Sequence, residues 1–273
     1  MSITLTRRLV AEFVGTALLV LFGPGSVVAA LRVGNGSLDY GGLGFIALAF
    51  GLVVAVVIYG FGAISGAHIN PAVTFTLALT RRFPWVEFVP YVVAQLLGAA
   101  VGGLLVVAIF STAAVDLGGV GSTVLSPDVS YASGVAAEAL GTFILVFAIM
   151  AVAVDPRAPK GWAGLMIGLA VTLAILVTGP LTGASLNPAR TFGPYLASAL
   201  FDGAPPWEDF SLYWLGPFIG GAAAAIVYDL VAQPRHVVVD VGAAESSPSG
   251  EEVDVAEDVG AAETSPAGQS GGR

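Results

Sequence analysis

Cysteine is absent from this chain of 273 residues, and lysine and histidine are nearly absent, with one Lys (Lys160) and two His (His68 and His236). Without cysteine the chain can form no disulfide bond and no thiolate-ligated metal site, and two isolated histidines form no ligand cluster. We therefore expect no metal, no cofactor and no enzymatic activity. Charged residues are also few, at 11% against 56% hydrophobic residues. This balance is typical of a protein that crosses a lipid bilayer several times, and we expect no nucleic-acid partner.

The formal net charge of -9 is concentrated at the C-terminal end of the chain. Residues 236–273 hold eight acidic residues and a single base, Arg273, whereas the preceding residues hold eleven acids and nine bases. Hydrophobic periodicity ends near Pro234, and DVGAAESSPSG from Asp240 is nearly repeated as DVGAAETSPAG from Asp258. This composition predicts a membrane domain over residues 1–232 and a disordered acidic tail over residues 233–273.

Apolar segments of membrane-spanning length predict six transmembrane helices, at residues 9–31, 41–62, 86–110, 133–154, 162–179 and 211–232. Six crossings place both ends of the membrane domain on the same side. The basic residues of the connections gather on that side: Arg7, Arg8, Arg81, Arg82, Arg157, Lys160 and Arg235. The opposite side receives mainly acids, with Arg32 as the exception. The positive-inside bias therefore predicts a multi-pass protein of the plasma membrane with both termini in the cytoplasm.

Two nearly identical segments stand between these spans, SGAHINPAVTF at residues 65–75 and TGASLNPARTF at residues 182–192. Each contains an Asn at a helix N-cap position, a Pro at the first helical position and an Ala: Asn70, Pro71 and Ala72 in the first copy, and Asn187, Pro188 and Ala189 in the second. The first apolar run ends at Thr80, so its helix reaches only about 15 Å, half of a hydrocarbon core of about 30 Å. Each copy therefore predicts a half-helix that enters the membrane without crossing it.

The two half-helices belong to an inverted repeat. Three predicted spans separate them, so they enter from opposite faces and their N-termini meet near the midplane. AEFVGTALLV from Ala11 resembles AEALGTFILV from Ala137, and YVVAQLLGAAVGG from Tyr91 resembles YWLGPFIGGAAAA from Tyr213. These similarities predict halves at about residues 5–110 and 130–232, with a substrate path at their interface.

Non-helical backbone inside a membrane is tolerated where it is buried in protein or lines a water-filled cavity. We therefore expect a narrow aqueous path lined by the carbonyl groups of Gly66, Ala67, His68, Gly183, Ala184 and Ser185. The alternative is that both segments are interfacial turns on the two faces. Helix N-termini and spare amide N–H groups at the midplane would repel cations, including hydronium, and would accept neutral oxygen atoms.

Three of the charged residues inside the predicted spans and half-helices are candidates for a functional role. Arg190 stands where the first copy has Val73, and we interpret it as a donor that lines the path; the alternative is a snorkelling Arg paired with an acid such as Asp202. Glu12 and Glu138 occupy matched positions of the repeat. We expect them to accept hydrogen bonds from the re-entrant backbone, with a proton relay as the alternative.

The motifs SGAHINPAV and TGASLNPARTFGP, with the AExxGT starts at Ala11 and Ala137, resemble those of the aquaporin, or major intrinsic protein, family over about residues 5–232. The resemblance implies an all-α membrane protein with six transmembrane helices and two re-entrant half-helices. It also implies a homotetramer with one pore in each subunit, and a passive water channel that excludes protons and ions. The selectivity filter of the family falls here on four residues: Phe50, Ile175, Ala184 and Arg190.

One filter position departs from the pattern of water-selective members, which usually carry His where this chain has Ile175. Glycerol facilitators instead carry Trp, a small residue and Phe at the first three filter positions, and Asp directly after the Arg, where this chain has Thr191. The resemblance therefore predicts efficient water conduction with at most slow passage of small uncharged solutes. The alternatives are a facilitator of glycerol or similar neutral solutes and, more distantly, a secondary transporter.

Overall fold

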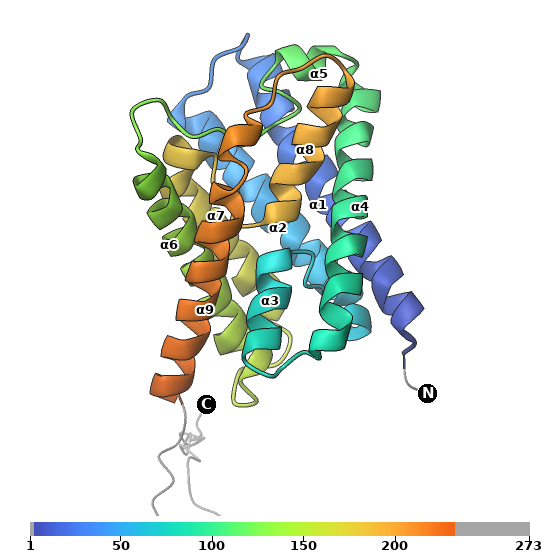
Figure 1. The fold of residues 1–273 in the computed structure, drawn as a ribbon, viewed down its shortest axis with the longest axis vertical. Coiled ribbons are helices and arrows are strands. Elements are labelled where there is room, and N and C mark those ends of the chain that lie inside the picture. The colour runs from blue at the N-terminus through green and yellow to red at the C-terminus, as the bar shows by residue number, and fades with distance from the viewer. Residues whose placement is uncertain (1–2, 233–273) are drawn as a thin grey trace, which may run out of the picture. The chain divides into compact units, whose positions relative to one another are not determined.

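The computed structural model describes residues 3–232, and these residues fold into helices and connecting loops without a strand (Figure 1). Six helices are long and apolar enough to cross a membrane. They are α1 (Leu5–Val33), α2 (Tyr40–Ser65), α4 (Trp85–Phe110), α6 (Tyr131–Ile149, continued by a π-helix over Met150–Val154), α7 (Ala163–Thr182) and α9 (Leu212–Ala232). All six spans predicted from the sequence are confirmed, with ends displaced by four residues or fewer. The acidic tail predicted for residues 233–273 lies outside the described residues.

Two half-helices complete the bundle, α3 (Pro71–Leu79) and α8 (Pro188–Leu200). Each begins at the predicted residue, because Pro sets a helical φ angle at the first position and the preceding Asn side chain accepts a backbone N–H of the first turn. In Figure 1, α8 descends from one end of the bundle and α3 rises from the other, with their N-terminal ends facing each other. The connections also hold the short helix α5 (Ala113–Asp116) and a 3-10 turn over Trp207–Asp209.

Long helices of the two halves pack in matched pairs, α1 with α4 and α6 with α9, while α2 packs with α7 across the interface between the halves. Close approach depends on glycines at equivalent positions of the repeat. A Cβ atom at Gly98 would lie 2.2 Å from the Phe13 carbonyl oxygen, and one at Gly220 would lie 2.0 Å from that of Ala139. Both distances are far below van der Waals contact, so the absence of a side chain sets these helix spacings.

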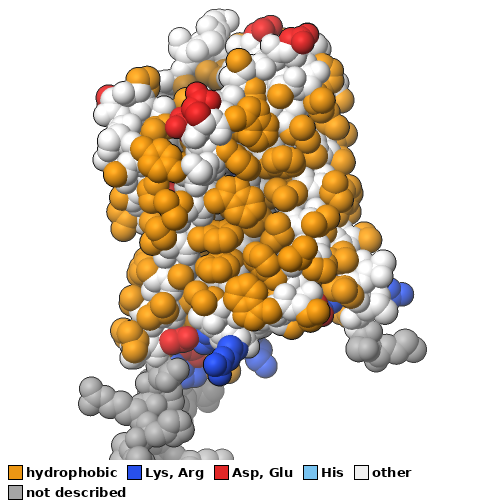
Figure 2. Space-filling view, in the orientation of Figure 1, with side chains coloured by type: hydrophobic (Ala, Val, Ile, Leu, Met, Phe, Trp, Pro, Cys, Tyr) orange, Lys and Arg blue, Asp and Glu red, His pale blue; other side chains and the backbone are white. Residues whose placement is uncertain are grey.

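The outer surface of the helices is apolar, and the charges gather at its two ends (Figure 2). Exposed side chains such as Phe45, Val56, Leu140 and Val177 are more than half exposed on this belt, as expected for helices that face lipid. Arginines cluster at the end where α3 and α9 finish, beside a few acids, and the opposite end carries acids without a basic cluster on the face shown (Figure 2).

Candidate functional site

The two loops that lead into the half-helices have left-handed backbone at four non-glycine residues. Their φ angles are 47° at Ala67, 44° at Ile69, 45° at Ala184 and 55° at Leu186. Each such residue costs on the order of 1–3 kcal/mol, so the surrounding structure must hold it in place. The three residues that precede the Asn of each motif, 67–69 and 184–186, are buried within the bundle, which argues against the alternative of interfacial turns.

Glu12, on α1, holds the first loop. One of its oxygens accepts hydrogen bonds from the Ser65 hydroxyl at 2.7 Å and the His68 N–H at 2.9 Å. The other oxygen accepts from the Ile69 N–H at 2.6 Å and the Gln95 side-chain amide at 2.8 Å. The carboxylate is fully buried. Four donors therefore satisfy a group that could not be buried alone.

Glu138, at the matched position on α6, holds the second loop in the same way. It accepts from the Thr182 hydroxyl at 2.6 Å, the Ser185 N–H at 2.8 Å and the Leu186 N–H at 2.7 Å. A fourth donor is absent from this set, since Pro217 stands where the first half has Gln95. These contacts leave both acids committed to the loops, which argues against the proton-relay alternative.

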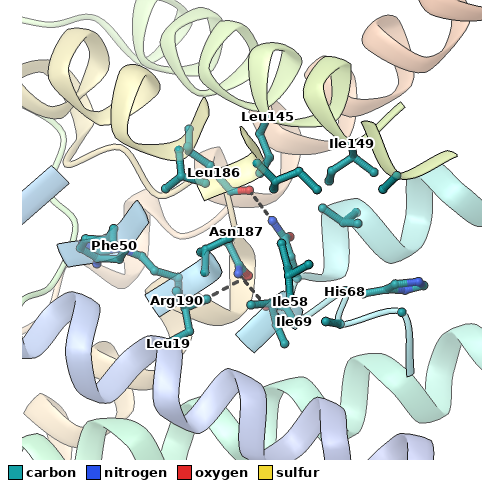
Figure 3. Close-up of a pocket in the computed structure, with 18 of the residues that line it drawn as sticks. Leu19, Phe50, Ile58, His68, Ile69, Leu145, Ile149, Leu186, Asn187 and Arg190 are labelled. Carbon is teal, nitrogen blue, oxygen red and sulfur yellow. Dashed lines mark hydrogen bonds between the residues drawn. The ribbon is translucent and has the colours of Figure 1, made fainter. Parts of the chain in front are cut away.

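Asn70 and Asn187 join the two loops to each other, and Figure 3 shows Asn187 between the loop residues Ile69 and Leu186. The Asn70 amide donates to the Leu186 carbonyl oxygen at 2.8 Å, and the Asn187 amide donates to that of Ile69, also at 2.8 Å. The side-chain oxygen of each Asn is occupied by the N-terminus of its own half-helix. Because an amide carries two N–H bonds, each Asn retains one for a ligand.

A cavity of about 220 Å³ passes this junction. Its polar lining comes from the two loops and includes Gly66, Ala67, His68, Ala184 and Ser185, together with both asparagines. Gly183 is not among the lining residues, because it packs against Thr123. Pro71, Ala72, Pro188 and Ala189 are buried but do not belong to the lining.

The rest of the cavity wall is aliphatic, and the sequence analysis did not identify it. The aliphatic lining residues that the sequence did not predict include Leu19, Val54, Ile58, Leu77, Leu145, Ile149, Ala153, Val154, Ile167 and Val171. They lie on several helices, and each resembles an ordinary core residue in the sequence. No local signal separates a lining residue from a packing residue in a helix that is apolar all round.

All four residues of the expected filter line the same cavity. The Arg190 guanidinium lies 5.0 Å from the centre of the Phe50 ring and donates to the Gly121 carbonyl oxygen at 2.8 Å. Its Nε atom is buried and has no partner among the described residues, so it is available to a ligand. Arg190 forms no ion pair with Asp202 within residues 3–232, and the snorkelling alternative is therefore wrong.

The connection between α4 and α6 also belongs to the site, and the sequence analysis missed it. Besides Gly121, it supplies Thr123, which is fully buried and whose hydroxyl lies 2.9 Å from that of Thr191 on α8. Tyr195 donates to the Thr123 carbonyl oxygen at 2.8 Å. This connection consequently fixes both the half-helix and the orientation of the Arg190 side chain.

His68 lies at the other end of the cavity from Arg190 in Figure 3. Its Nδ1 atom lies 3.2 Å from the Thr74 hydroxyl, which also accepts from the Gln95 amide at 3.0 Å. Gln95 therefore connects the pore-lining histidine to Glu12. Its neighbours in the sequence are apolar, and its polarity inside a predicted span is the signal that could have identified it.

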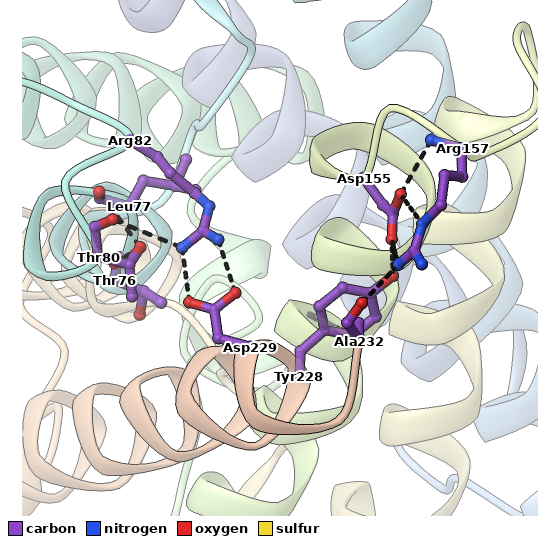
Figure 4. A network of polar contacts seen from close by, with 9 residues as sticks. All are labelled: Thr76, Leu77, Thr80, Arg82, Asp155, Arg157, Tyr228, Asp229 and Ala232. Atoms are coloured by element: carbon purple, nitrogen blue, oxygen red, sulfur yellow. Dashed lines mark hydrogen bonds and ion pairs between the residues drawn. The ribbon is translucent and has the colours of Figure 1, made fainter. Parts of the chain in front are cut away.

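Polar contacts also hold the end of the π-helix, whose residues Ala153 and Val154 line the cavity (Figure 4). The π-helix ends at Asp155, whose carboxylate accepts from the Arg157 guanidinium and from the Tyr228 hydroxyl at 2.7 Å. Arg157 also donates to the Ala232 carbonyl oxygen at 2.9 Å. The Arg157 guanidinium holds the pKa of Asp155 well below its usual value.

Comparison with known proteins places this geometry in a family. The family model "Major intrinsic protein" matches residues 1–228. The protein named "Probable aquaporin AqpM" of Archaeoglobus fulgidus is 49% identical over 246 residues, which cover 85% of this chain and 100% of the relative. "Aquaporin AqpM" of Methanothermobacter marburgensis is 46% identical over 239 residues, which cover 83% and 97%.

A solved structure agrees with these sequence matches. The X-ray structure of the aquaglyceroporin from Plasmodium falciparum is similar with a TM-score of 0.76 at 26% identity, covering 84% of this chain and 97% of that chain. The fold and the site thus define a multi-pass membrane protein of the inverted-repeat channel class. The chain belongs to the major intrinsic protein family, and the resemblance that its repeated motifs carry is confirmed.

Proposed function

We propose that this protein is a passive water channel that excludes protons and ions. One observation carries the proposal. The N-termini of the two half-helices meet at a cavity large enough to hold water, and Asn70 and Asn187 each retain one N–H donor there. The named aquaporin relatives support it. The residues that line the described cavity form no coupling-ion site, so this lining does not support the secondary-transporter alternative.

Charge exclusion follows from the ends of the half-helices. Each N-terminus contributes roughly half a positive charge, and both point at the same place in a medium of low dielectric constant. A cation there loses its hydration shell and meets a repulsive field, whereas a water oxygen accepts hydrogen bonds from the two amides. This step applies the general account of selectivity in aquaporin-type pores to the residues of this chain.

The filter residues determine which neutral solutes can pass. We propose that Phe50 and Arg190 narrow the path while Ile175 supplies no polar partner, so that water passes efficiently and small uncharged solutes pass slowly. A glycerol facilitator is the second candidate. The apolar side chain at Ile175 favours it, as does the similarity to a solved aquaglyceroporin.

The setting of the channel is also a proposal. The arginine-rich end of the bundle supports an orientation with both termini in the cytoplasm, and we propose the plasma membrane as its location. We propose that residues 1–232 form the channel from inverted halves at about 5–110 and 130–232, that the acidic tail follows, and that four subunits assemble. Native mass spectrometry in detergent micelles tests the assembly, which a predominantly monomeric species would contradict.

Stopped-flow light scattering on reconstituted vesicles tests the function. We expect water permeability well above that of empty vesicles, with a low activation energy, and glycerol permeability far below that of water. Ile175→Trp is the control, because a large side chain in the filter closes the path while leaving the loops and their hydrogen bonds intact. Glycerol flux comparable to water flux would favour the facilitator, and water flux equal in wild type and Ile175→Trp would contradict the channel.

A further inference from the structure

A shallow groove lies outside the channel, at the arginine-rich end of the bundle where α3 turns into α4. It is lined by Ala78, Arg81, Arg82, Phe83, Pro84 and Trp85. Arg81 ends the half-helix in a left-handed conformation, with a φ angle of 61°, and α4 begins at Trp85. Because this turn joins a half-helix to a membrane-spanning helix, the groove lies at the level of the lipid headgroups.

The inverted repeat builds the same turn a second time, at the opposite end of the molecule. There Asp202 follows α8 with a φ angle of 62°, and Pro206 and Trp207 follow it. The equivalence extends to packing, since Trp85 lies edge-on to Phe75 at 6.0 Å and Trp207 lies edge-on to Phe192 at 6.4 Å. The fold therefore requires the left-handed residue and the tryptophan but not a positive charge at this position.

The two arginines of the groove differ in their partners. Arg82 forms a two-point ion pair with Asp229 on α9, at 3.0 and 2.6 Å, and its side chain remains 29% exposed (Figure 4). Arg81 is exposed and forms no side-chain hydrogen bond or ion pair with any residue from 3 to 232. Glu87, the acid nearest along α4, is paired with Arg8 at 2.7 Å. One guanidinium is thus held in position, and the other has no counter-charge in the described part of the protein.

The tryptophan completes the groove on its lipid side. Its ring is fixed between Phe75 and Phe88 but is still 52% exposed, and its indole N–H has no acceptor in the structure described. Val86 and Val89, on the next turn of α4, are 84% and 64% exposed. An amphipathic ring beside bare aliphatic side chains is typical of the boundary between headgroups and acyl chains.

We propose that this groove binds the headgroup phosphate of an anionic phospholipid. The Arg81 guanidinium pairs with the phosphate, and the Trp85 indole N–H donates to a headgroup oxygen. The acyl chains then lie along the exposed face of α4. Basic sites at membrane-helix ends commonly recognise anionic lipids, and the reversed charge at Asp202 confines this one to a single leaflet. The proposal does not depend on water conduction.

Titration of the purified full-length protein by native mass spectrometry tests the proposal, with phosphatidylglycerol and phosphatidylcholine of the same acyl chains as probes. Arg81→Asn removes the charge, and Asn tolerates the left-handed conformation. Asp202→Asn is the matched control at the equivalent turn, and Arg7→Asn removes an exposed arginine at the same end. We expect Arg81→Asn to weaken phosphatidylglycerol binding by about fivefold and phosphatidylcholine binding much less, because the choline cation offsets the charge of the phosphate with which Arg81 pairs.

Both controls should bind phosphatidylglycerol as the wild type does. An equal loss in Arg7→Asn would show attraction to net charge instead of a site, and an unchanged affinity in Arg81→Asn would also overturn the proposal. In a last experiment, inorganic phosphate or glycerol phosphate is added at millimolar concentration to compete with the bound lipid. Failure of both to displace the lipid supports a lipid site, and full displacement by either would show a site for soluble anions in its place.

Discussion

The central residues of the pore each perform more than one task with a single side chain. Asn70 and Asn187 use the amide oxygen to cap a half-helix, one N–H to hold the opposite loop, and leave the other N–H to the cavity. Glu12 and Glu138 likewise accept hydrogen bonds from backbone N–H groups that lipid could not satisfy, and they thereby hold left-handed residues in place. Neutralising one of these acids therefore affects the shape of the pore through the loops.

The two acids should respond differently to replacement by Gln, which keeps one acceptor and turns the other into a donor. In Glu12→Gln, the NH₂ group of the new amide replaces an oxygen that accepts two hydrogen bonds, so it faces two donors. In Glu138→Gln, the NH₂ group can replace the oxygen that accepts only one, from the Leu186 N–H. Each conflict leaves a buried donor unsatisfied at about 1–3 kcal/mol. We expect both variants to unfold at lower temperature, with Glu12→Gln affected about twice as much. Equal loss in the two variants, measured by thermal unfolding in detergent, would contradict the four-donor and three-donor arrangement.

The filter offers a second prediction at this scale. Ile175→His adds a ring and a polar group opposite Arg190, so it should lower the permeability to glycerol and other solutes larger than water several-fold, while water conduction persists. Vesicle swelling rates measure both. Ile167→Val, a change in the same cavity wall but outside the filter, is the control. An unchanged or higher solute rate in Ile175→His would place the filter elsewhere.

At the scale of the elements, the bundle depends on contacts between backbones and on the fixed ends of its helices. The pairs α1–α4 and α6–α9 approach at glycines, and hydroxyl groups of Tyr91 and Tyr213 tie α4 and α9 to the loop entrances at 3.0 and 2.9 Å. The two halves are thus similar because equivalent residues make the same contacts. Gln95 and Pro217 are an exception, because they occupy equivalent positions but differ in chemistry.

Helix contact can be tested with glycine-to-alanine variants. Gly98→Ala and Gly220→Ala place a methyl group against a neighbouring backbone carbonyl and should destabilise the protein by about 1–3 kcal/mol. Gly60→Ala is the matched control, because the space around Gly60 on α2 is open and Ala favours the helix by up to about 1 kcal/mol. Thermal unfolding in one detergent compares the three. Similar midpoints in all of them would mean that these glycines do not set the helix spacing.

The end of the π-helix should give the fold a dependence on pH. Because the pKa of Asp155 is lower in the folded protein than in an unfolded chain, its ion pair stabilises the fold above the ordinary carboxyl value of about pH 4. That stabilisation is lost progressively as the pH falls below this value, because the unfolded chain then binds a proton that the folded protein still excludes. Thermal midpoints measured from about pH 7 to pH 3 should fall less steeply in Asp155→Asn than in the wild type. Parallel curves would contradict the assignment.

At the scale of the whole molecule, the features that could be predicted from the sequence are those that repeat or that depend on composition, namely the six spans and the two half-helices. Asn70 and Asn187 could be predicted to lie close together because two copies of a motif, an odd number of spans between them and the N-cap chemistry all constrain the same residues. Gly121 and Thr123 could not be predicted, because a loop residue that reaches the filter has no local pattern. The π-helix was missed as well, since its apolar residues also suit an α-helix, and Gly183 was misplaced in the lining because sequence spacing does not fix carbonyl direction.

The account of the whole molecule requires that water passes while charge does not, and one measurement examines both. Vesicles that contain the protein and a trapped pH indicator are exposed to an osmotic gradient and then to a proton gradient. We predict rapid shrinkage with no internal pH change beyond that of empty vesicles. Asn187→Asp should retain the helix cap but add negative charge at the meeting point of the half-helices, and proton entry should rise. Sustained proton entry or ionic current through the wild type, at rates that accompany its water flux, would contradict the account.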